Sequence, residues 1–318
     1  MNTLPCTTNI NKRCQSHDDS MVQHCEGRFE TSDFMALYYQ AWIPSSTPQA
    51  IVGIVHGLGS HSGMFSTVID HLTPHGYGIY GLDLRGHGRS PGQRGYIQDW
   101  SDFRNDVQHF LHLIIAHHPN TPIVLWGHSL GGLIVLDFVL RCHAHASPLC
   151  GIVITAPALG SVGVSPLRIL IGKMLSRLWP RFSLDTGLKT IPAAHDPIIA
   201  QAVLTDPLCH HKGTARLATE FCKTAQWVRS HASHLHLPIL MLHGSDDLVT
   251  HPESSRLFFD DIPWVDKQRN EYEGSYHDLH IDTHHHDVLT DVQHWLAHHL
   301  LSIENSLESN RCSCERES

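Results

Sequence analysis

The chain has 318 residues, of which 41% are hydrophobic and 17% charged, so it can bury one large core or two smaller ones. Its net charge of −9 is spread along the sequence, which argues against nucleic acid as a partner because phosphate binding needs a clustered basic surface. The nine cysteines form no secreted disulfide pattern, and neither a signal peptide nor a run of about 20 apolar residues is present. We therefore expect a cytoplasmic protein with reduced thiols.

The N-terminal half alternates between polar and strongly apolar segments. Residues 1–25 have no hydrophobic period and are predicted to be a polar tail. From Phe29 to Ile43 the alternation of apolar and polar residues predicts an antiparallel hairpin. Short apolar runs bounded by glycine and proline come next, as is typical of strands buried on both faces of a parallel sheet. These runs are 50–56, 77–83, 122–127, 151–156 and 238–244.

Helical patterns separate the apolar runs. Three of them cover residues 62–75, 99–117 and 129–143, and a fourth covers 286–303 near the end of the chain. Strands that alternate with helices predict a doubly wound α/β fold, with a mostly parallel central sheet and helices on both faces. Residues 305–318 are again polar and are predicted to be a second tail.

The alternation is interrupted once. Between Pro157 and Leu237 the chain has no convincing buried strand, and it has helical patterns at 166–181 and 212–233. An insertion of this length at the carboxyl ends of the strands, where α/β sheets bind ligands, predicts a helical cap. The helix at 166–181 has an apolar stripe opposite a basic face, which fits both a lipid-facing lid and a helix packed on the core. The apolar stripe comprises Leu167, Leu170, Ile171, Met174, Leu175 and Leu178, and the opposite face comprises Arg168, Gly172, Lys173, Ser176 and Arg177.

Histidine is unusually frequent, with 30 residues, many in pairs or a triple. No HExxH pattern is present, and the Cys312–Cys314 pair has no histidine near it in sequence. We therefore expect solvated surface histidines, and neither a metal site nor a cofactor.

The segment GHSLG, residues 127–131, places Ser129 between two glycines where a β-rich run ends and a helical pattern begins. A sharp strand-to-helix turn raises such a serine above the sheet at the positive end of a helix, and the glycines allow close approach of the backbone. A plain structural turn would also fit the pattern. The flanking strand and helix favour a nucleophile.

A serine hydroxyl needs a general base, and the base needs a carboxylate that orients it. In this fold class the order along the chain is serine, acid, histidine. The segment after the strand at 238–244 offers Asp246 and Asp247, and the segment after the next strand offers His277 and His280. Spacing alone does not separate the members of either pair.

The oxyanion of a tetrahedral intermediate also needs hydrogen-bond donors. The backbone N–H of Leu130 directly follows the serine, and the loop after the strand at 50–56 offers the N–H of Leu58. His56 is expected to support that loop.

Five motifs in order, HGLGSHSGMF, GLDLRGHGRSPGQRGYI, GHSLGG, HGSDDLVT and YEGSYHDLH, resemble the monoacylglycerol lipase and lysophospholipase family of α/β-hydrolases. The resemblance extends from about Glu26 to Leu301. It implies an α/β-hydrolase fold with residues 26–156 and 237–304 as the core and 157–236 as the cap. It also implies that Asp247 is the acid and His277 is the base.

The resemblance implies a serine hydrolase that cleaves the carboxylester of a single-chain lipid, most readily monoacylglycerol, through an acyl-enzyme. It also implies that the cap makes transient contact with membranes. Lysophospholipase and general carboxylesterase activities use the same residues and stay open, as does peptidase activity. A ligand receptor that kept the fold without turnover is the alternative from another class.

Overall fold

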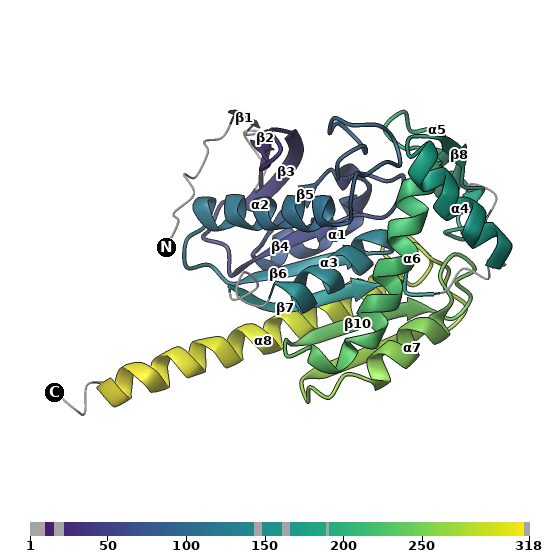
Figure 1. Ribbon diagram of the computed structural model, residues 1–318. Coiled ribbons are helices and arrows are strands. Elements are labelled where there is room, and N and C mark those ends of the chain that lie inside the picture. Colours follow the sequence, from purple (N-terminus) through teal and green to yellow (C-terminus); the bar gives the residue numbers. More distant parts are fainter. Residues whose placement is uncertain (1–9, 16–21, 143–147, 161–165, 189–190, 315–318) are drawn as a thin grey trace.

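The computed structural model describes residues 10–15, 22–142, 148–160, 166–188 and 191–314. It contains a central sheet whose strands are numbered with the helices in Figure 1. The strands are β1 (Ile10–Gln15), β2 (Val22–Glu30), β3 (Ala36–Pro44), β4 (Ala50–Val55), β5 (Tyr77–Leu82), β6 (Ile123–His128), β7 (Leu149–Thr155), β8 (Ser183–Asp185), β9 (Lys212–Thr214), β10 (Ile239–Gly244) and β11 (Lys267–Tyr272). The helices are α1 (Ser66–Leu72), α2 (Ser101–His117), α3 (Leu130–Arg141), α4 (Pro166–Leu178), α5 (Pro197–Thr205), α6 (Ala215–Ser230), α7 (Pro252–Asp260) and α8 (His285–Cys314), with short 3₁₀ turns at Ser62–Phe65, Thr73–His75 and Ala232–His234.

The central sheet has the strand order β1-β2-β3-β5-β4-β6-β7-β10-β11. The pairs from β5 through β11 are parallel, and β1, β2 and β3 add an antiparallel edge. The five apolar runs predicted to be buried strands are β4, β5, β6, β7 and β10, and the α/β class is confirmed. β11 lacks such a run because it lies at the sheet edge, where its side chains are exposed or only half-buried.

Each face of the sheet carries its own layer of helices (Figure 1). Successive residues of a strand point to opposite faces, so Ile51 and Val55 of β4 belong to one apolar cluster and Val52 and Ile54 to the other. The first cluster includes side chains of α2, α3 and α6, and the second includes side chains of α1 and α8. Because both faces are covered, the inner parallel strands β4, β5, β6, β7 and β10 are mostly apolar.

The segment predicted as a cap contains α4, β8, α5, β9 and α6, and α4, β8 and α5 lie together beyond one end of the sheet (Figure 1). β8 and β9 form a separate two-stranded sheet, which the sequence reading did not predict because each strand is only three residues long. Helix α6 also packs on the core through Ala225 and Val228.

The division of α4 into an apolar stripe and an opposite polar face does not match which of its side chains are buried. Met174 and Leu178 are exposed, and Ser176 from the opposite face is buried. Ser176 also contacts the neighbouring helix α6, where Arg216 donates a hydrogen bond to the Ser176 carbonyl. The side chains of Leu167, Arg168, Leu170 and Ile171 lie outside the described residues.

The prediction of polar tails is wrong for the terminal residues that form strands or a helix. β1 and the start of β2 lie within residues 1–25, and α8 continues to Cys314. The prediction of reduced thiols is also wrong for Cys14 and Cys25, which face each other across the β1–β2 pair and form a disulfide. A polar edge strand has no hydrophobic signal of its own, so the sequence reading had no register that would bring these cysteines together.

The histidines are less solvated than predicted. Eight of the described ones are buried, namely His56, His61, His87, His128, His243, His277, His280 and His299. Their burial follows from ring stacking and from hydrogen bonds, as in the Phe65–His280 stack, and isolated histidines have no pattern that reveals such partners. None of the helices in the described ranges is both long enough and apolar enough to cross a bilayer.

Candidate active site

Ser129 lies at the turn between β6 and α3, in a backbone conformation with a positive φ of 55° and ψ −116°, which residues other than glycine rarely adopt. Three backbone hydrogen bonds hold this strained turn: its N–H donates to the Thr155 carbonyl, and its own carbonyl accepts from Leu133 and Ala158. A Cβ at Gly131 would lie only 1.9 Å from the Val55 carbonyl oxygen, so the turn requires glycine there. The turn therefore presents the hydroxyl on a rigid support.

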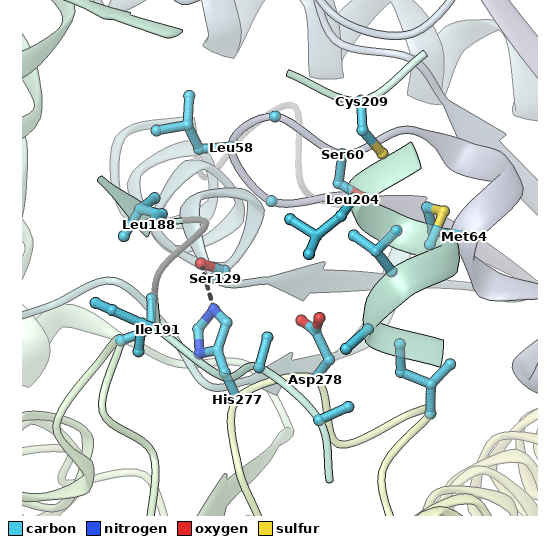
Figure 2. Close-up of a pocket in the computed structure, with 18 of the residues that line it drawn as sticks. Leu58, Ser60, Met64, Ser129, Leu188, Ile191, Leu204, Cys209, His277 and Asp278 are labelled. Carbon is cyan, nitrogen blue, oxygen red and sulfur yellow. Dashed lines mark hydrogen bonds between the residues drawn. The ribbon is translucent and has the colours of Figure 1, made fainter. Parts of the chain in front are cut away.

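His277 joins Ser129 to Asp247. Its Nε2 lies 2.9 Å from Ser129 Oγ, and its Nδ1 lies 2.7 Å from Asp247 Oδ2 (Figure 2 shows the first of these contacts). Because ionised Asp247 can only accept, Nδ1 carries the proton and Nε2 offers its lone pair to the serine hydroxyl. This is the geometry that general-base activation of a serine requires.

The pKa of His277 is the result of opposing influences. Burial is the largest and favours the neutral ring, but the nearby Asp247 carboxylate and its hydrogen bond more than offset burial and raise the pKa above its usual value. Burial favours the neutral form of Asp247 as well, which for a carboxyl group means a raised pKa. His277, His243 and the Thr250 backbone outweigh burial and together hold the pKa of Asp247 far below its ordinary value. The pair therefore combines a permanent carboxylate with a strengthened base.

Asp246 and His280, the alternatives to Asp247 and His277 in the sequence, lie in different environments. Asp246 is exposed, and its Oδ1 accepts a hydrogen bond from Ser245. His280 is buried and stacks on Phe65 with ring centroids 4.4 Å apart. Burial lowers the pKa of His280 to about 3, so its ring stays neutral. Neither is hydrogen-bonded to Ser129 or to the Asp247–His277 pair.

Two further side chains contact the acid and were not predicted from the sequence. The Thr250 hydroxyl donates to Asp247 Oδ2 over 2.8 Å, and His243 Nε2 lies 3.1 Å from the same oxygen. His243 also bonds the Thr250 carbonyl and the Ser255 hydroxyl, so it is fixed from both ring nitrogens. Both belong to the motif HGSDDLVT, and only their spacing from Asp247 in sequence could have indicated that they contact it.

The predicted oxyanion donors flank Ser129. Leu130 is the first residue of α3, where a backbone N–H has no partner within the helix. Leu58 follows β4 in a loop that His56 supports: His56 Nδ1 donates to the Gly57 carbonyl, and its Nε2 accepts from the Leu84 N–H. Among the described residues no hydrogen bond uses the Leu58 N–H, so it is free to bind an incoming oxygen.

A cavity of about 380 Å³ opens above Ser129 and His277 (Figure 2). Its size is at the lower end of the range for small-molecule sites, and its walls are mostly apolar. The cap supplies much of this apolar lining through Leu188, Ile191, Ile199, Ala200, Val203 and Leu204. The cavity could bury the acyl chain of a substrate away from water while the ester carbonyl lies beside Ser129.

Among the described residues, two groups of side chains have the chemistry of metal ligands, with ligand atoms within 4.8 Å of one another. The first is His61, Asp206 and Cys209. His61 Nδ1 accepts the Gly63 N–H, so its Nε2 holds the proton that it donates to Asp206, which leaves no lone pair for a metal. The second group, His128, His277 and Asp278, contains the candidate base itself. The hydrolytic geometry described above needs no metal.

Comparisons with a family model, with known sequences and with solved structures all indicate the same family. A family model described as serine aminopeptidase S33 matches residues 46–284. The monoacylglycerol lipase of Mycolicibacterium smegmatis is 32% identical over 266 residues, covering 83% of this chain and 94% of that protein. The crystal structure of Paleococcus ferrophilus monoacylglycerol lipase superposes with a TM-score of 0.73 at 30% identity, covering 83% of this chain and 99% of that one.

The chain belongs to the monoacylglycerol lipase family of α/β-hydrolases. Monoglyceride lipase of Rattus norvegicus is similar as well, at 27% identity over 85% of this chain and 89% of that protein. Members of this family are serine hydrolases, and the chain is a carboxylic ester hydrolase. The family resemblance and the fold predicted from the motifs are confirmed.

Proposed function

We propose that this hydrolase cleaves monoacylglycerol to fatty acid and glycerol, with Ser129 as nucleophile, His277 as base and Asp247 as the acid that orients it. The observation that carries the proposal is the hydrogen-bonded line from Asp247 through His277 to Ser129, which ends beneath an apolar cavity. The names of the relatives in Mycolicibacterium smegmatis and Paleococcus ferrophilus support the same substrate.

The proposed reaction has two halves. Ser129 Oγ attacks the ester carbonyl while His277 Nε2 takes the hydroxyl proton, and the N–H groups of Leu58 and Leu130 stabilise the oxyanion. His277 then donates that proton to the departing glycerol oxygen, leaving the acyl group on Ser129. Water, deprotonated by the same histidine, releases the fatty acid and restores the serine.

A substrate panel tests the proposal. Purified protein is assayed with monooleoylglycerol, oleoyl lysophosphatidylcholine, dioleoylglycerol and an alanyl p-nitroanilide, because the family description also includes aminopeptidases. We expect the highest kcat/KM with monooleoylglycerol, and no turnover by Ser129→Ala. Preference for the anilide or for the lysophospholipid would refute the proposed substrate, and full activity of Ser129→Ala would refute the proposed nucleophile.

We also propose that residues 157–236 act as a cap that touches lipid surfaces transiently. Support comes from large apolar side chains on the outside of the cap: Leu178 is 77% exposed, Trp179 62% and Ile198 78%. Exposed Lys173 and Arg177 lie on the same element as Leu178 and would attract anionic head groups, by about 1 kcal/mol each near a surface. Helix α5 has apolar residues toward the cavity and others toward solvent, so it could pass a lipid from the surface into the cavity.

A further inference from the structure

Asp278 follows the candidate base directly, but it has no part in the reaction proposed above. Its carboxylate lines the cavity, and in Figure 2 it projects into the same space as Ser129 and His277. Oδ1 lies 3.0 Å from His128 Nε2, whereas no hydrogen bond from a described residue reaches Oδ2. The side chain keeps about 20% of its surface exposed, and that surface belongs to the cavity wall.

The hydrogen bonds around His128 determine the charge of this group. Trp126 Nε1 donates to the Thr155 hydroxyl, which can in turn donate to His128 Nδ1 and leave the Nε2 proton for Asp278. Burial lowers the pKa of His128, so the imidazole is neutral. Burial raises the pKa of Asp278, but the bond from His128 and the neighbouring imidazoles outweigh this and lower it to about 2. The pair therefore carries one negative charge.

No residue with a permanent positive charge lies in the described lining. Among the described residues that line the cavity, Asp278 is the one carboxylate, and none is lysine or arginine. Burial lowers the pKa of His210 to about 4 and that of His280 to about 3, so these rings are neutral as well. An anionic group near Ser129 would meet Asp278 in a poorly hydrated space, where Coulomb repulsion is stronger than in water.

We propose that Asp278 is a specificity-determining residue that selects an uncharged, hydroxyl-bearing leaving alcohol over an anionic one. The free Oδ2 accepts a hydrogen bond from a hydroxyl such as those of glycerol, and the charge disfavours a phosphate in the same place. The charge also speeds the departure of the fatty acid, which becomes a carboxylate at Ser129. This inference rests on the proposed function, and it identifies the side chain by which monoacylglycerol is separated from lysophospholipid.

The test compares 1-oleoylglycerol with 1-oleoyl-lysophosphatidic acid in the same neutral detergent micelles, because the two share the acyl chain, glycerol and scissile ester. Wild type should favour the uncharged substrate. Asp278→Asn keeps an acceptor for His128 but removes the charge, so the ratio of the two kcat/KM values should fall about 10-fold, equivalent to about 1.4 kcal/mol. Asp278→Glu should keep the ratio high. Inhibition by oleate, measured on a short-chain ester, should strengthen several-fold in Asp278→Asn.

Asp246→Asn is the matched control, since it makes the same change at an exposed carboxylate, and it should leave the ratio unchanged. Lys189 lies outside the described residues but between two lining positions in sequence, so Lys189→Gln is included. An equal loss on both substrates in Asp278→Asn, or a larger change of ratio in Lys189→Gln, would overturn the proposal. Asp278→Ser provides a second neutral variant if the asparagine variant fails to fold. Wild type inactive on 1-oleoylglycerol would instead refute the proposed function.

Discussion

Asp246 and Asp247 are adjacent in sequence but differ in environment, and this difference predicts their mutant phenotypes. Asp247 accepts hydrogen bonds from His277, Thr250 and the Val249 N–H, whereas Asp246 is exposed. Asp247→Asn should lower kcat by about 10⁴-fold, because an amide in place of the carboxylate favours the wrong tautomer of His277. Asp246→Asn should change kcat by less than about 2-fold, as surface substitutions generally have small effects. Steady-state kinetics on a soluble ester measure both, and the reverse order would refute the assignment of Asp247.

The pH dependence of the rate follows from the His277 pKa. The base must be neutral to accept the serine proton, so kcat/KM should be low in acid, rise through the His277 pKa and level off above it. Because Asp247 raises that pKa, the midpoint should lie above the reference value of about 6.5. Asp278→Asn removes a second carboxylate that raises this pKa and should move the midpoint to lower pH. A rate independent of pH from 5 to 8, with acylation limiting, would contradict a histidine base.

At the scale of single elements, the turn from β6 into α3 depends on close contact between backbones. Gly131→Ala would force its Cβ against the Val55 carbonyl and should destabilise the fold by about 1–3 kcal/mol or more. Gly172→Ala is a matched control within helix α4, where a Cβ would meet nothing within 4 Å. It should be neutral or stabilise by about 0.5–1 kcal/mol, because alanine favours helix. Urea unfolding of the two variants measures both, and equal stability would show that β4 and α3 can separate at no cost.

The elements that could be predicted from sequence are those with a strong local signal. The buried strands β4, β5, β6, β7 and β10 are continuous apolar runs, and the turn at Ser129 needs glycines at fixed positions. Elements without such a signal were missed, such as the polar edge strand β1 and the short β8–β9 pair. Their positions depend on partners distant in sequence.

The same division holds within the site. Ser129 was predicted from its motif, but the choice between Asp246 and Asp247 could not be made from spacing, because both follow β10 at once. The choice depended on the resemblance to a family. The contacts of His243 and Thr250 with Asp247, and of His128 with Asp278, are visible only when separate strands and loops are brought together. Hydrogen-bond partners of buried polar groups are thus the least predictable part of the site.

For the whole molecule, the remaining feature to explain is the exposed apolar surface of the cap. Large apolar side chains on a surface carry no stability benefit, and clustered ones mark sites of contact with other molecules or membranes. The alternative, that the α4 stripe packs on the core, does not fit Met174 and Leu178, which are exposed. For the lipid ester substrate proposed above, a membrane is the surface from which the enzyme would take it.

Leu178→Glu and Ile198→Glu test this role of the cap, with Val265→Glu as the control at a fully exposed position of the core domain. Burial of one such side chain in lipid stabilises docking by about 1.5–3 kcal/mol, so each cap variant should lose roughly 10-fold or more in activity on vesicle-borne monoacylglycerol. Since both side chains are already exposed, the melting temperature and the hydrolysis of soluble short-chain esters should stay close to wild type. Val265→Glu should match wild type in all three measurements. A large fall in melting temperature for both cap variants, or equal vesicle activity in all of them, would exclude docking through this surface.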